Sequence, residues 1–60
     1  MPKYMLVYKD EDGDSHVSFA STFDVANGDR MDMEVSLGWY VELYERITDE
    51  EGLTSYVLIM

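Results

Sequence analysis

Apolar and polar positions alternate most clearly across residues 37–47, around a glycine at position 38. The two kinds of position follow one another in turn: Trp39, Val41, Leu43 and Ile47 alternate with Tyr40, Glu42, Tyr44 and Arg46. A period of two residues is typical of a strand with one apolar face and one amphipathic face. The segment therefore predicts a strand with which the rest of the chain must pair.

Three further segments have the composition of strands. Residues 3–9 are dense in β-branched and aromatic residues, and residues 16–20 alternate with Val17 and Phe19 on one side. An Asp-Gly step between these two segments favours a hairpin turn. Residues 53–60 are again apolar and follow an acidic connection. The sequence thus predicts one hairpin in each half of the chain.

A helical stripe runs through the intervening residues 21–37. Its members are spaced three or four residues apart: Phe23, Ala26, Arg30, Met33 and Leu37. Ser21 followed by Asp24 is typical of a capped helix start, and Gly38 stands where a left-handed terminator belongs. These signals predict a helix that begins near Thr22 and ends before Gly38.

The same residues also fit a strand. Residues 31–37 alternate apolar and polar side chains, and Asn27-Gly28 is a frequent hairpin dipeptide whose glycine would cost about 1 kcal/mol inside a helix. A strand ending here would have to reverse through residues 36–39, which lack the polar side chains that such turns prefer. We therefore favour the helix.

The resulting fold is α+β: a β-β-α-β-β domain of residues 1–60, with a mainly antiparallel four-stranded sheet and one helix on one face. The alternative is an all-β five-stranded meander or small barrel. In the favoured fold the helix packs on Trp39, Val41 and Leu43, together with Val17 and Phe19. Because one helix covers only one sheet face, we expect the other face to stay open.

Charge and composition limit the function. The 60 residues include 13 acidic and 4 basic side chains, for a formal net charge of -9, and no cysteine. Such a charge repels nucleic-acid phosphates and anionic lipid headgroups, so no direct binding to nucleic acid or membranes is expected. The chain is 47% hydrophobic, which is too apolar for a disordered acidic tail. Without cysteine or a segment typical of secretion or membrane insertion, the sequence predicts a cytoplasmic protein.

No motif predicts catalysis, a cofactor or a metal site. Residues 10–14 carry aspartates at alternate positions, as calcium-binding loops do, but Ser15 and Ser21 stand where such a loop needs glycine and glutamate. His16 is the only histidine, and it has no cysteine or serine nucleophile motif beside it. We therefore interpret the acidic segment as a solvated turn and the protein as a non-enzyme without cofactors.

Aromatic and acidic side chains provide the candidate binding residues. Tyr40 and Tyr44 lie opposite the apolar face of their strand, and one register of the first strand places Tyr4 and Tyr8 beside them. An open aromatic face of this kind is typical of a protein interface. The candidate partner-binding residues are Tyr4, Tyr8, Tyr40 and Tyr44, with the carboxylates Asp29, Asp32, Glu34 and Glu42.

These residues favour a non-enzymatic, acidic protein-binding module. Its carboxylates would imitate the phosphates of a nucleic acid and occupy the basic, nucleic-acid-binding surface of a partner protein. The alternative is a structural homo-oligomer, such as a homodimer, that associates through the aromatic sheet face. A minimal acidic domain without catalytic groups is similar to the small accessory proteins and inhibitors of phages and mobile elements, by analogy of fold and not by any motif.

Overall fold

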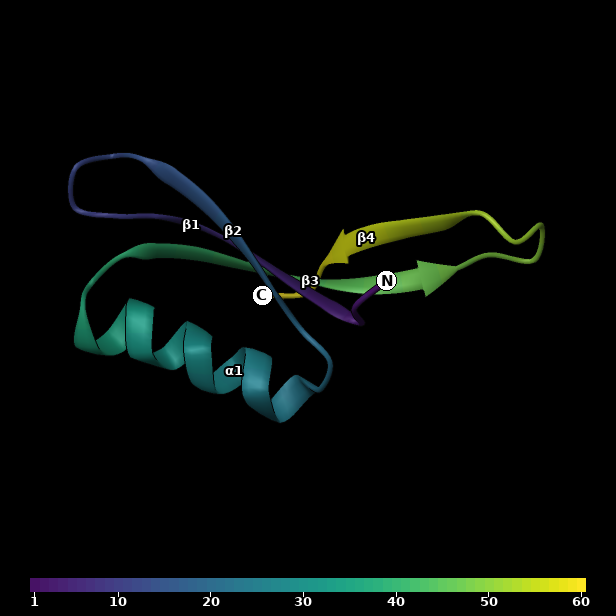
Figure 1. Ribbon diagram of the computed structural model, residues 1–60, viewed down its shortest axis with the longest axis horizontal. Helices are drawn as coiled ribbons and strands as arrows, with labels where there is room; N and C mark the ends of the chain where they lie inside the picture. Colours follow the sequence, from purple (N-terminus) through teal and green to yellow (C-terminus); the bar gives the residue numbers. More distant parts are fainter.

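Four antiparallel strands form one sheet in the computed structural model, which describes residues 1–60 (Figure 1). The strands are β1 (Tyr4–Lys9), β2 (Ser15–Ala20), β3 (Tyr40–Thr48) and β4 (Thr54–Leu58), in the spatial order β2-β1-β3-β4. Between β2 and β3 lie the helix α1 (Phe23–Met31) and a π-helical turn, η1 (Asp32–Ser36). The predicted α+β fold is confirmed, and the all-β alternative is wrong.

Thr22 and Gly38 fix the two ends of the helical segment. The Thr22 hydroxyl accepts a hydrogen bond from the N–H of Val25 at 3.3 Å. Thr22 is therefore the N-cap, and the cap expected at Ser21 is wrong by one residue, because either hydroxyl could have served. Gly38 has a φ of 72°. Glycine adopts this left-handed conformation without strain, so the predicted terminator is confirmed.

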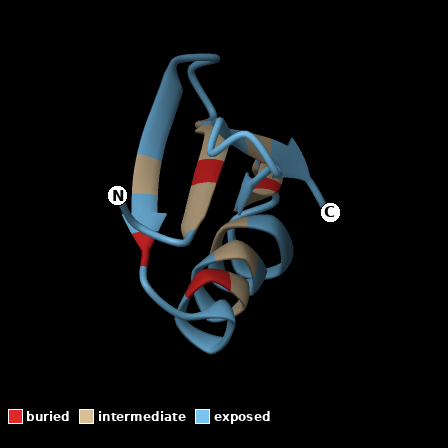
Figure 2. Cartoon of the chain, turned by 90° about the vertical axis from the view of Figure 1, so that its right-hand side faces the viewer, coloured by how far each residue is buried: buried red, intermediate tan, exposed pale blue.

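The core lies between the helical segment and the sheet. Five residues are buried: Leu6, Ala20, Ala26, Val41 and Leu43. Around them pack the partly buried side chains of Tyr4, Tyr8, Met33 and Trp39. In Figure 2 the buried positions lie on the helix and on the strands next to it. The predicted packing of the helix on the apolar face of β3 is thus confirmed.

The face of β2 that meets the helix differs from the prediction. Leu6 stands opposite Ser18 in the β1–β2 register, and Ala20 is buried. Val17 and Phe19 consequently lie on the opposite face, where they are more than half exposed. Both faces of β1 are apolar, so alternation alone could not decide the register. Small side chains under the helix let it approach the sheet closely, whereas bulky ones would hold it away.

The helix covers only part of its sheet face. It contacts β1, β2 and β3, while β4 and the second half of β3 extend past it (Figure 1). The molecule is accordingly elongated, with extents of 40 × 22 × 16 Å. Phe23 and Leu37 were expected in the core, but they lie near the ends of the helical segment and remain exposed. Of the predicted stripe, Ala26 and Met33 contact the core.

The two hairpin loops are built alike. In each loop an aspartate, Asp10 or Asp49, accepts hydrogen bonds on Oδ1 from the N–H groups two and four residues later, at 2.9–3.0 Å. A glycine with a φ of 84°, Gly13 or Gly52, follows three positions after the aspartate. Aspartate and glycine at these positions are therefore turn-forming residues, which explains part of the acidic composition.

Candidate protein-binding surface

The sheet face turned away from α1 is formed by side chains from all four strands. We call it the open face. The strand registers place on it the apolar and aromatic side chains of Met5, Val7, Val17, Phe19, Tyr40, Tyr44, Tyr56 and Leu58, the charged side chains of Lys9, Glu42 and Arg46, and the small polar residues Ser15, Thr48 and Thr54. Tyr40 and Tyr44 lie on it, as the sequence predicts. No helix of the chain packs against this side of the sheet (Figure 1).

Large side chains of the open face remain accessible. Val17, Phe19, Tyr40 and Leu58 are each more than half exposed, and Tyr40 reaches 63%. Glu42 is the only carboxylate of the face, because the other acidic residues lie in the two loops, in the helical segment and on the helix side of β3. A chain with a net charge of -9 thus presents an aromatic surface nearly free of negative charge.

Glu42 links the two tyrosines of β3. The Tyr40 hydroxyl donates a hydrogen bond to Glu42 Oε2 and the Tyr44 hydroxyl donates one to Oε1, each at 3.1 Å. Because the carboxylate favours the protonated phenols, these hydrogen bonds raise the pKa of Tyr40 and of Tyr44 above the ordinary 10.0. Both rings are held in place within the free chain, which lowers the entropy cost of binding a partner.

An aromatic contact spans the open face from edge to edge. The rings of Phe19 on β2 and Tyr56 on β4 lie with their centroids 6.3 Å apart and their planes at 50°. The two strands are separated by β1 and β3 in the sheet, so the rings lean toward each other across these inner strands. The Tyr56 hydroxyl also donates to the Pro2 carbonyl at 2.7 Å. The face is therefore a preformed aromatic surface.

Tyr4 and Tyr8 do not join the open face. The register places both on the helix side of β1, where the Tyr4 ring meets Phe23 edge to face at 5.8 Å. The Tyr8 ring stacks with Trp39 at 6.0 Å. Their expected position beside the tyrosines of β3 is thus wrong. Leu6 lies between Tyr4 and Tyr8 on the same face of β1, and because Leu6 is buried in the core, both tyrosines point to the helix side.

Sequence reasoning missed Val17, Phe19 and Leu58 as members of this surface. The available signal was the loop before β2, in which an aspartate and a glycine three residues later form a defined turn. A defined turn sets the strand register, and here it pairs even-numbered residues of β1 with even-numbered residues of β2. With Leu6 in the core, that register assigns Val17 and Phe19 to the open face.

The predicted carboxylates do not form one surface. Glu34 is in an ion pair with Arg30, whose Nη1 lies 2.7 Å from Glu34 Oε2. Asp29 and Asp32 line a pocket between the helical segment and the sheet. Glu42 lies on the open face. The four residues therefore occupy three different parts of the molecule.

The aspartates of the first loop come close enough to suggest a cation site, since carboxylate oxygens of Asp10, Asp12 and Asp14 lie within 4.8 Å of one another. Asp10 nevertheless already accepts two backbone hydrogen bonds, and His16 Nε2 lies 2.8 Å from its second oxygen. The hydrogen bond with His16 lowers the pKa of Asp10 from 3.8. Loop geometry thus explains the cluster, and the absence of a metal site stays a prediction.

Comparisons with family models, with curated proteins and with solved structures give no match. No helix in the fold has the length and apolar character needed to cross a membrane. The function is therefore inferred from the open face and its surroundings.

Proposed function

We propose that the chain is a non-enzymatic protein-binding module whose open face docks on a partner protein. The observation behind this proposal is the accessibility of the face, since Val17, Phe19, Tyr40 and Leu58 are each more than half exposed. Extended apolar patches are uncommon on monomers and typical of interaction sites. Aromatic residues are also enriched in the cores of interfaces, where a few of them carry most of the binding energy.

The charge around the open face defines the partner. The two acidic loops lie at opposite ends of the molecule, which is 40 Å long (Figure 1). An apolar centre between two negative ends is complementary to an apolar patch flanked by basic residues. Because nucleic-acid-binding proteins present basic surfaces of that kind, the proposed partner is such a protein. Docking would block its nucleic-acid site, which is the action of an accessory inhibitor.

Capture of proteins from a lysate on the immobilised chain tests the proposal. Phe19→Ser with Tyr40→Ser removes two exposed rings from the open face. We expect the retained proteins, identified by mass spectrometry, to be basic and to dissociate as salt is raised. The double substitution should weaken their binding at least about tenfold, as loss of a central aromatic contact does.

Val35→Ser with Leu53→Ser is the matched control, because it removes two comparably exposed apolar side chains outside the open face. Retention should be unchanged in this control. Equal losses in both double variants would show that general surface hydrophobicity, and not the open face, retains the proteins. Retention that does not respond to salt would contradict a basic partner.

A structural homo-oligomer is the second candidate function, and the edge strands favour it. The sequences of β2 and β4, SHVSFA and TSYVL, contain no lysine, proline or acidic residue. Edge strands usually carry such residues to prevent pairing between copies. Sedimentation across micromolar concentrations distinguishes the two functions. A dimer that Phe19→Ser with Tyr40→Ser abolishes would identify a second copy as the occupant of the open face, whereas a dimer that persists in this variant would indicate pairing along the edge strands.

A further inference from the structure

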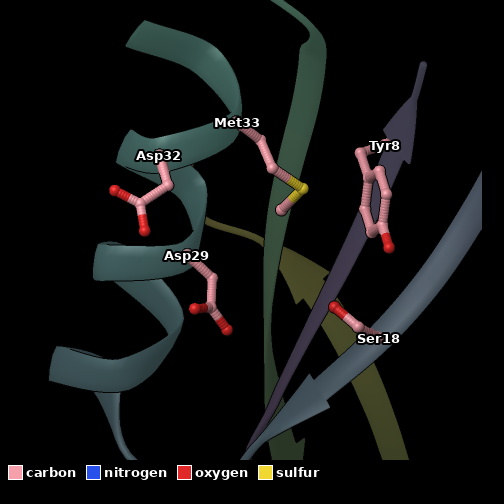
Figure 3. Close-up of a pocket in the computed structure, with 5 residues that line it drawn as sticks. All are labelled: Tyr8, Ser18, Asp29, Asp32 and Met33. Atoms are coloured by element: carbon pink, nitrogen blue, oxygen red, sulfur yellow. The ribbon is translucent and has the colours of Figure 1, made fainter. Parts of the chain in front are cut away.

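A pocket of about 310 Å³ lies on the other side of the sheet, between the helical segment and the β1–β2 hairpin. Its lining residues are Tyr8, Ser18, Asp29, Asp32 and Met33 (Figure 3). The volume is at the lower end of ligand pockets, which span about 300–1,000 Å³, and suits a group the size of one side chain. None of the five residues belongs to the open face, so the pocket is a separate site.

The polar groups of the pocket have no partner within the chain. None of the three ion pairs includes Asp29 or Asp32. The hydroxyl hydrogen bonds of the protein involve other tyrosines and threonines, not Tyr8 or Ser18. Asp29 extends from the helix into the gap that Ser18 borders from the sheet (Figure 3). The Asp29 carboxylate thus faces the gap, and the Asp32 carboxylate lies at its outer rim, on the side away from the sheet (Figure 3).

Tyr8 and Met33 form the apolar part of the pocket, and the side that Tyr8 provides is fixed. The Met33 side chain points from the helical segment toward the ring of Tyr8 (Figure 3). That ring stacks with His16 at 5.3 Å and 25°, and with Trp39 at 6.0 Å and 10°. A three-ring stack holds Tyr8 in one position, so the pocket is preformed on the sheet side.

We propose that this pocket binds the guanidinium group of an arginine side chain from another protein. Two carboxylates and no basic side chain in the lining favour a cationic ligand, and the hydroxyls add further acceptors. A guanidinium has five N–H donors in a planar fork that suits carboxylates, and its flat faces pack on aromatic and thioether groups. An ammonium has three donors, is more strongly hydrated and lacks the flat faces. The pocket therefore favours arginine over lysine.

Titration of the labelled chain with N-acetyl-argininamide, followed by NMR, tests the proposal. We expect saturable shift changes centred on the five lining residues. Asp29→Asn with Asp32→Asn should weaken binding at least tenfold. The matched control, Asp24→Asn with Glu50→Gln, removes the same charge from exposed positions outside the pocket, and should bind within about twofold of the unmodified chain. All four positions are exposed, and retained shift dispersion confirms folding.

Three outcomes would overturn the proposal. Shifts that grow linearly and spread over the acidic loops, with equal losses in both double variants, would show only attraction to the net charge. Equal affinity for N-acetyl-lysinamide would remove the preference for guanidinium. Tighter binding of free arginine than of the capped form would assign the pocket to the amino acid itself, because the free α-carboxylate is otherwise repelled by the two aspartates. Each result is independent of the open-face experiments.

Discussion

The two faces of the sheet bury their side chains to different extents. On the helix side Leu6 and Leu43 are fully buried, whereas Phe19 on the open face is 53% exposed. Both faces offer apolar and aromatic residues, so hydrophobicity alone did not select the core. The helix packs over the small side chains of β2, and the bulky ones remain outside. The comparison indicates that the covered face stabilises the fold and that the open face is available for binding.

Truncation in the covered face should have the largest effect. Leu43→Ala removes a fully buried side chain from the strand that contacts both β1 and the helix. Such changes cost about 2–5 kcal/mol, which is comparable to the whole stability of a domain this small. Denaturation followed by circular dichroism should therefore show a largely unfolded protein. A variant with nearly unchanged stability would mean that the core lies elsewhere.

The glycine that ends the helical segment should have the next largest effect. Gly38→Ala meets no atom within 4 Å, so its cost is conformational only, about 1–2 kcal/mol at a φ of 72°. Gly28→Ala is the matched control, because it also meets no atom within 4 Å but lies in helical conformation. It should stabilise the protein by about 0.5–1 kcal/mol. Melting temperatures that move in the same direction would contradict this assignment of the two glycines.

A change in the open face should affect stability much less than a change in the covered face. Phe19→Ser removes a ring that is more than half exposed and lies on an edge strand. We expect the free energy of unfolding to fall by less than about 1 kcal/mol. Urea denaturation of Phe19→Ser and of Leu43→Ala under the same conditions measures the two losses in free energy of unfolding. A loss similar to that of Leu43→Ala would show that the open face is part of the core.

Glu42→Gln should change the titration of Tyr40 and Tyr44 clearly and lower the stability only slightly, because both tyrosines lie at the surface. The carboxylate raises the pKa of Tyr40 and of Tyr44 through the two hydrogen bonds. The contribution of these hydrogen bonds to stability is therefore present below pH 10.0, and it is lost as the pH rises through the raised pKa values of the folded protein. Without the charge, both phenols should ionise closer to 10.0, as absorbance of the phenolate reports. Glu45→Gln, on the helix side of the same strand, is the control and should leave both titrations unchanged.

Much of the fold follows from the sequence because its signals are local. Alternation in β3, the helical stripe and a left-handed glycine at position 38 each depend on neighbouring residues, and together they give β-β-α-β-β. The choice between helix and strand for residues 31–37 was decided by the turn that a strand would need. The observed N-cap, Thr22, lies one residue after the predicted one, Ser21, because the two neighbouring residues offer equivalent hydroxyls.

The candidate site was predictable only in part because it depends on strand register. Tyr40 and Tyr44 were placed correctly, since β3 has one clearly apolar face. Tyr4 and Tyr8 were not, because the first strand is apolar on both faces and its register is set by pairing across the sheet. The pocket was not predicted as a site, although Asp29 and Asp32 were named, because it needs the helix and β2 in contact.

Hydroxyl-radical footprinting of the chain alone and bound to a captured partner tests the role of the open face most directly. The method reports the accessibility of individual side chains by mass spectrometry. If the open face docks on the partner, Phe19, Tyr40 and Leu58 should be protected, while Val35 and Leu53 should react as they do in the free chain. Protection of Val35 or Leu53 with unchanged reactivity of Phe19 and Tyr40 would contradict the proposed interface.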